Sequence, residues 1–152
     1  MTIPRLFLCL ASLAASLTLN SLGADAPPAP PAPAAPAAPA AAGKLPPAAD
    51  QKGVTYATDV KPILDKSCAT CHGADRPKGR LRLDNLDGAL RGGGSGKAVI
   101  PGNSAGSLLV KNVAHTGDPR AYMPPPNNRS NIPPLTSDQV GLLRAWIDQG
   151  AK

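Results

Sequence analysis

The stretch Cys68-Ala69-Thr70-Cys71-His72 constrains this chain more than any other feature. C-x-x-C-H is the attachment site of a c-type haem, in which two thiols bond to the haem vinyl groups and the adjacent imidazole becomes an iron ligand. A bare C-x-x-C also suits a dithiol redox couple or half of a zinc site, but neither gives the following His a role. The motif therefore predicts one covalent haem c, attached through Cys68 and Cys71 with His72 as the proximal iron ligand.

Three other uses of the cysteines remain open, although they fit less well. A structural zinc needs four N or S ligands, and adjacent Cys71 and His72 would have difficulty closing one tetrahedron with Cys68 and His115. A catalytic dithiol is expected at the start of a helix within a strand–helix–strand unit, and the chain shows no such alternation. A disulfide between the two cysteines would leave His72 without a function.

The first 24 residues have the layout of a secretory signal peptide. One basic residue, Arg5, precedes a nearly unbroken apolar stretch from Leu6 to Leu19, and small residues follow. We predict cleavage after Ala24 or Ala26. The apolar stretch is short for a membrane span, so membrane attachment is expected only if the signal is retained as an anchor. The protein is therefore predicted to be exported, to the periplasm or another extracytoplasmic space.

Composition divides the rest of the chain into two parts. Residues 25–52 are nearly all Ala and Pro, which favours polyproline II and predicts a disordered, semi-rigid linker. Residues 53–152 form one domain of about 100 residues, a size with little core to spare. Its only aromatic residues are Tyr56, Tyr122 and Trp146, and a haem would supply the missing flat apolar mass.

Hydrophobic spacing predicts three helices in this domain. The first begins at a Thr58-Asp59 cap and ends at the cysteine pair, with Pro62 tolerated in its first turn. The second spans Ser107 to Val113. The third opens at residues 135–138, buries Val140, Leu143, Trp146 and Ile147 on one face, and ends at Gly150. The domain is therefore predicted to be mainly helical and rich in loops.

Met123 is the candidate for the distal iron ligand. It lies 51 residues after His72, and it is the only methionine left once the signal is removed. Three prolines follow it, and a residue before proline favours an extended backbone from which a side chain can project. The other possible role of a lone Met is core filler, and His115 is the competing candidate for a ligand.

Several further motifs follow one another along the chain in a family-like order. They are Tyr56-x-x-Asp59-Val60-x-Pro62-Ile63-Leu64, Cys68-x-x-Cys71-His72-Gly73, Lys78-Gly79-x-Leu81-Arg82-Leu83-Asp84, Gly92-Gly93, Val99-Ile100-Pro101-Gly102, Ser107-Leu108-Leu109, Met123-Pro124-Pro125 and Trp146-Ile147-Asp148-Gln149-Gly150-Ala151. Over nearly all of residues 54 to 151, this run resembles the planctomycete-type cytochrome c domain, a class I-like c-type cytochrome with a single haem.

The resemblance implies an all-α fold, a small class I cytochrome c-like helical domain wrapped around one covalent haem, with His72 proximal and Met123 distal. The chain departs from the family pattern at Arg80, where a second Gly is usual. The domain is also commonly fused to larger partners.

One-electron transfer is the chemistry that these features predict, so we expect an electron carrier rather than an enzyme. Strong ligands on both faces leave the iron no open site for a substrate, and a Met thioether raises its reduction potential. The alternative is a haem subunit of a periplasmic oxidoreductase, or a gas-binding haem sensor whose sixth site is open or labile. For the electron carrier, Pro77 is a weak candidate to accept a hydrogen bond from the His72 ring. Lys78, Arg80 and Arg82 are candidates to pair with the haem propionates.

The net charge of +6 indicates the kind of partner. Loss of Arg5 with the signal leaves +5, and a basic surface would steer the protein toward a redox partner with an acidic docking surface. Nucleic acid is a poor alternative, because aromatic and basic residues do not interleave. The glycine-rich run at 92–97 lacks the Gly and the Ser or Thr that a phosphate loop requires, since Arg91 and Ala98 stand there. It is predicted to be a flexible turn near the haem rim.

Overall fold

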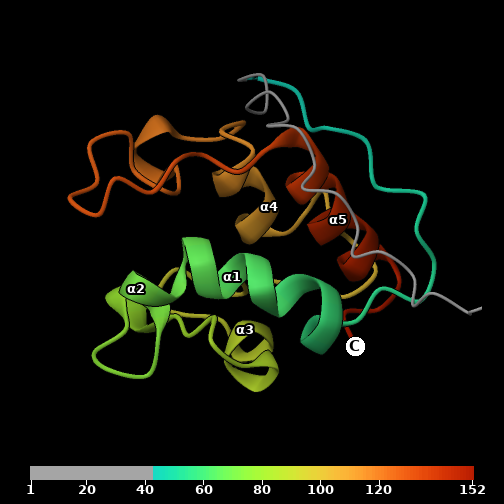
Figure 1. Cartoon of the computed structure of the whole chain (residues 1–152), viewed down its shortest axis with the longest axis horizontal. Coiled ribbons are helices and arrows are strands. Elements are labelled where there is room, and N and C mark those ends of the chain that lie inside the picture. Colours follow the sequence, from blue (N-terminus) through green and yellow to red (C-terminus); the bar gives the residue numbers. More distant parts are fainter. Residues whose placement is uncertain (1–42) are drawn as a thin grey trace, which may run out of the picture. The chain divides into compact units, whose positions relative to one another are not determined.

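Short helices joined by loops make up residues 43–152, the part of the chain that the computed structural model describes (Figure 1). The predicted signal peptide and the linker up to residue 42 lie outside the described residues. Within 43–152 there is no strand, and the only sheet-like pairing is an isolated bridge between Gly93 and Gly96. This confirms the predicted all-α class. No helix in this range is long and apolar enough to cross a membrane.

The described helices are all short. The main ones are a π-helical turn at Tyr56–Val60, α1 at Lys61–Ser67, α2 at Ala69–His72, α3 at Leu86–Arg91, α4 at Leu108–Val113 and α5 at Ser137–Asp148, with 3₁₀ turns at Lys78–Arg80 and Pro119–Ala121.

The first helical segment starts earlier than predicted. Its cap is Thr55, whose side chain accepts a hydrogen bond from the Thr58 N–H (3.3 Å), while the Asp59 carboxylate accepts one from the Thr55 N–H (2.9 Å). These two bonds satisfy helix-end donors reciprocally, so the turn begins three residues before the predicted cap. Pro62 lies in the first turn of α1, directly after the π-helical turn. The segment therefore runs directly into the cysteine pair.

Helix α5 is the core element of the domain, and its prediction is confirmed. Thr136 caps it in a reciprocal capping box with Gln139. The four predicted apolar positions, including Trp146, are fully buried. The Trp146 ring packs against Tyr56 with centroids 5.8 Å apart, which joins α5 to the π-helical turn that precedes α1. Helix α4 was also predicted, and it packs against α5.

Residues 45–52, which we call the N-terminal strap, pack along α5 rather than leading freely into it. The Ala49 N–H donates to the carbonyl of Gly141 (2.9 Å), and the Gln149 amide donates to the Gln51 carbonyl (2.8 Å). A Cβ at position 141 would lie 2.8 Å from the Pro47 carbonyl oxygen, so this approach requires glycine. The folded domain thus begins before residue 53, where the change in composition placed its start.

Helix α3 was not predicted from the sequence. The Asn85 side chain caps it by accepting a hydrogen bond from the Gly88 N–H (2.7 Å). The helix is short and carries a glycine at its centre, so its apolar spacing is too brief to read. Gly92 ends it with a φ of 83°, in the left-handed region that favours glycine.

Candidate functional site

A cavity of about 530 Å³ opens between α2, α4 and the loop that follows the Pro119–Ala121 turn. Cys68, Cys71, His72 and Met123, the four residues predicted to bind a haem, all line it. They come from places 55 residues apart in the chain, and the fold brings them to one space. The apolar side chains of the remaining wall are Leu81, Leu83, Ala98, Leu108, Leu109, Val113, Pro124, Pro125 and Ile132.

The orientation of the His72 ring is fixed by the extended segment at residues 81–83. Its Nδ1 lies 3.2 Å from the Leu81 carbonyl oxygen, and the Leu83 N–H donates to the His72 carbonyl (2.8 Å). With Nδ1–H donating to that carbonyl, the lone pair of Nε2 is available to a metal in the cavity.

The prediction that Pro77 accepts this hydrogen bond was wrong. The Pro77 carbonyl accepts instead from the Arg80 N–H (3.0 Å) and closes the turn at Lys78–Arg80. Gly79 and Arg80 both have a positive φ in this turn, 60° and 57°. The turn reverses the chain, and so it is Leu81 rather than Pro77 that faces His72.

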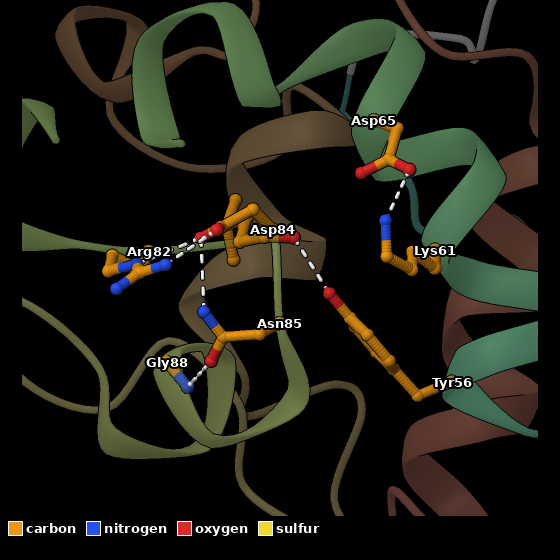
Figure 2. Close-up of polar contacts among 8 residues, drawn as sticks. Tyr56, Lys61, Asp65, Arg82, Asp84, Asn85 and Gly88 are labelled. Atoms are coloured by element: carbon orange, nitrogen blue, oxygen red, sulfur yellow. Dashed lines mark hydrogen bonds and ion pairs between the residues drawn. The ribbon is translucent and has the colours of Figure 1, made fainter. Parts of the chain in front are cut away.

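The 81–83 segment is itself held by buried and paired side chains (Figure 2). The Tyr56 hydroxyl donates to the Leu83 carbonyl (2.9 Å), and burial raises the pKa of Tyr56 to about 12. The Arg82 guanidinium makes two bonds to Asp84, at 3.0 and 2.6 Å. These bonds lower the pKa of the Asp84 carboxyl to about 2, with further help from the Asn85 amide. The support behind His72 therefore reaches from the π-helical turn at Tyr56–Val60 to the cap of α3.

Burial sets the chemistry of the two thiols, which are not joined in a disulfide. Cys68 is 8% exposed, and burial raises the pKa of its thiol to about 12. Cys71 is less buried. A catalytic dithiol needs a thiolate stabilised near neutral pH, and Cys68 has the opposite environment. Since His115 lies outside the cavity wall, it does not join the two cysteines and His72 as a fourth zinc ligand.

The glycine-rich run at 92–97 forms one wall of the cavity. Gly93, Gly94 and Gly96 line it, and the Gly94 N–H donates to the Gly79 carbonyl (2.7 Å). A Cβ at Gly93 would lie 2.7 Å from that same carbonyl oxygen, so only glycine permits the two loops to touch. No helix follows the run directly, because α4 starts at Leu108. The structure therefore places this run in the wall of the cavity, where the sequence predicted a turn near the haem rim.

Helix α4 supplies the support for Met123. The Met123 N–H donates to the carbonyl of Asn112 (3.1 Å), and Nε2 of His115 lies 3.3 Å from the Met123 carbonyl oxygen. Met123 is partly buried and packs against the core cluster, and the peptide bond to Pro124 is cis. His115 contacts the backbone of Met123 and does not line the cavity. Nothing in the sequence indicated this contact.

Two cations, Lys78 and Arg129, line the cavity, and no carboxylate does among residues 43–152. Of the three cations predicted to face the haem propionates, Arg82 is already paired with Asp84, and Arg80 is not part of the wall. Arg129 was missed, because it belongs to none of the motifs identified in the sequence. The sequence signal that could have indicated Arg129 was its place shortly after Met123, the candidate distal ligand.

The residues of this cavity fit a covalently attached haem. Two thiols, an imidazole with a free Nε2 and a thioether are the donor set of a c-type haem with two axial ligands. The apolar wall suits the macrocycle, and the volume lies within the usual range of about 300–1,000 Å³ for cofactor sites. The cations at the wall suit its carboxylates. Fold and site together define a c-type cytochrome domain.

The comparison with known families agrees. Residues 68–127 match the family model of planctomycete cytochrome C, so the chain carries a domain of the planctomycete cytochrome c family. This confirms the resemblance predicted from the sequence, and membership of a cytochrome c family implies covalently bound haem c. Hydrazine synthase subunit alpha of Kuenenia stuttgartiensis is 31% identical over 126 residues, which cover 67% of this chain and 16% of that protein. The chain thus corresponds to a small part of that relative. No solved structure matches significantly.

Proposed function

We propose that this protein is a mono-haem c-type cytochrome that transfers single electrons between redox proteins. In this proposal Cys68 and Cys71 form the thioethers, His72 is the proximal iron ligand and Met123 the distal one. The observation that carries the proposal is the convergence of these four side chains on one cavity with an apolar wall. A bound haem would supply a reversible one-electron couple, and His72 and Met123 together would leave its iron no open site for a substrate.

The chain's own residues would then set the redox properties. The Leu81 carbonyl holds the His72 ring and raises the basicity of Nε2 through the hydrogen bond at Nδ1. The leucine and valine side chains of the wall exclude water, which disfavours the more highly charged oxidised state. Lys78 and Arg129 neutralise the propionates.

Export and docking complete the proposal. The layout of residues 1–24 supports a secretory signal peptide, and covalent attachment of haem c in the periplasm or another extracytoplasmic space fits that route. The net charge of +5 that remains after loss of Arg5 supports a redox partner with an acidic docking surface. The membrane is involved only if the signal is retained.

The test is a potentiometric titration of the matured protein, followed by exposure of its reduced form to carbon monoxide. We expect one reversible one-electron wave and no carbon monoxide binding at neutral pH. Met123→Ala should lower the reduction potential and open the iron to carbon monoxide, because the thioether that stabilises ferrous iron is gone. Pro126→Ala, on the same loop but outside the cavity wall, is the matched control and should resemble the wild type. Carbon monoxide binding by the wild type would contradict the proposal.

A second candidate is a haem-bearing subunit of an oxidoreductase. It is favoured by the similarity to hydrazine synthase subunit alpha, whose name is that of an enzyme subunit. In that case the sixth site is open or labile, as it would also be in a gas-binding sensor. Carbon monoxide binding without denaturant separates both of these from the carrier.

A further inference from the structure

The backbone of Met123 is held at both of its polar groups by the end of α4. Its N–H donates to the Asn112 carbonyl at 3.1 Å, and its carbonyl oxygen lies 3.3 Å from Nε2 of His115. Asn112 belongs to α4, and His115 comes two residues after that helix ends. One helix end therefore fixes the residue whose side chain lines the cavity from the distal side.

His115 is also held in place. Its ring stacks on Tyr122, the residue before Met123, with centroids 4.5 Å apart and planes 4° from parallel. Its backbone adopts a φ of 53°, a left-handed conformation that a residue with a Cβ seldom takes. Such a backbone persists only where the surroundings require it. Here the left-handed turn accompanies a ring that both stacks on Tyr122 and reaches the Met123 carbonyl.

We propose that His115 is a positioning residue that keeps the Met123 thioether on the haem iron. The inference rests on the proposed function, since it concerns the distal ligand of that same site. An intact hydrogen bond at the Met123 carbonyl and an intact stack at Tyr122 restrict the loop before the polyproline run. A restricted loop loses less entropy when the thioether binds, so the bound state is more populated. His115 thus acts through Met123, and it is not itself a ligand.

The experiment measures how readily an added ligand displaces Met123. Matured, oxidised protein is titrated with imidazole at one fixed pH, and the weak far-red sulfur-to-iron band is followed. We expect His115→Phe, which keeps a stacking ring but loses the donor, to bind imidazole roughly three- to tenfold more tightly than the wild type, the factor that one hydrogen bond typically contributes. His115→Ala, which also loses the stack, should bind it at least as tightly as His115→Phe.

Two variants separate positioning from general loosening of the turn. His115→Gln retains an N–H donor, so it should restore much of the wild-type resistance to imidazole. Thr116→Ala removes a hydrogen bond from the Thr116 hydroxyl to the Lys111 carbonyl in the same turn (3.4 Å) but does not touch Met123. It should leave the imidazole affinity unchanged.

The outcomes distinguish this inference from the proposed function. A wild type with a far-red band, combined with His115→Phe and His115→Ala affinities equal to that of the wild type, overturns the role of His115 alone. An equal gain in affinity in Thr116→Ala also overturns it, because any loosening would then suffice. A wild type without the band removes Met123 as a ligand, and both proposals fall. If His115→Ala does not mature, the His115→Phe and His115→Gln pair carries the test.

Discussion

At the scale of single residues, the proximal side of the site depends on side chains that never reach the cavity. The Tyr56 hydroxyl donates a hydrogen bond to the Leu83 carbonyl, and the N–H of the same Leu83 donates one to the His72 carbonyl. The Tyr56 hydroxyl is buried, so its hydrogen bond has no replacement from water. The sequence marked Tyr56 as part of a motif but could not say what it bonds to.

Replacing Tyr56 by Phe tests this support. The ring would still pack on Trp146, but the Leu83 carbonyl would lose a buried donor. We expect the free energy of unfolding of the haem protein to fall by about 1–2 kcal/mol, measured in urea. Tyr122→Phe is the matched control and should change it by less than about 0.5 kcal/mol, because the Tyr122 hydroxyl has no hydrogen-bond partner among residues 43–152. Equal losses in both variants would contradict a special role for Tyr56.

The Arg82–Asp84 pair predicts a dependence of stability on pH. The pKa of Asp84 is lowered to about 2 in the folded state from an ordinary value of 3.8. Between these values the unfolded chain binds more protons than the folded one. The stability that ionised Asp84 contributes above about pH 4 is therefore lost as the pH falls toward 2. Asp84→Asn should therefore reduce stability at pH 6 and flatten this acid limb. Thermal unfolding of both proteins at pH 6, 4 and 2.5 measures this effect. An unchanged acid limb in Asp84→Asn would contradict a stabilising role for the Arg82–Asp84 pair.

At the scale of elements, the sequence predicted those helices for which both a capping residue and a regular apolar spacing can be recognised. Residues 135–138 marked the start of α5, where the structure has Thr136 as the cap, and the buried face of this helix follows from regular spacing. Helix α3 lacks such a face, and the turn at Lys78–Arg80 depends on two positive φ values that no spacing rule gives. The choice of Leu81 over Pro77 as the His72 partner follows from that turn, so it could not be predicted.

The N-terminal strap was not predicted to be part of the folded domain, because of its composition. Its residues share the Ala and Pro bias of the linker, yet Ala49 donates a backbone hydrogen bond to α5. Ala49→Pro removes that donor and should lower the free energy of unfolding by about 1 kcal/mol. Ala48→Pro is the control, because the Ala48 N–H has no partner within residues 43–152. Equal stability of the two variants would mean that the strap contributes nothing through this bond.

At the scale of the whole molecule, the four residues that the sequence named as haem-binding candidates line one cavity. The C-x-x-C-H motif and the single mature methionine sufficed to name four residues, because covalent chemistry restricts the choice to few side chains. Asn112 and Arg129 were not named, and His115 was named only as a competing ligand, because these residues contribute through backbone contacts or through the place of a loop at the wall. Such contributions depend on the path of the chain in space.

The charge of the molecule gives a further prediction about association. If the cavity wall with Lys78 and Arg129 faces an acidic partner, electron transfer to an acidic redox protein should slow as ionic strength rises. Lys78→Gln or Arg129→Gln should lower the rate at low salt and reduce the slope against ionic strength. Lys52→Gln, a charge change of the same size on the strap, is the control. A greater effect of the strap variant would place the docking surface elsewhere.

The central claim, a covalent haem with His72 and Met123 as its ligands, is tested most directly by the absorption spectrum of the matured protein. The spectrum is recorded in the oxidised and reduced states, and again after denaturation. We predict that the haem stays with the denatured polypeptide and that the oxidised wild type shows the weak far-red sulfur-to-iron band, which Met123→Ala lacks. Haem that leaves the denatured chain, or a wild type without the band, would contradict the claim.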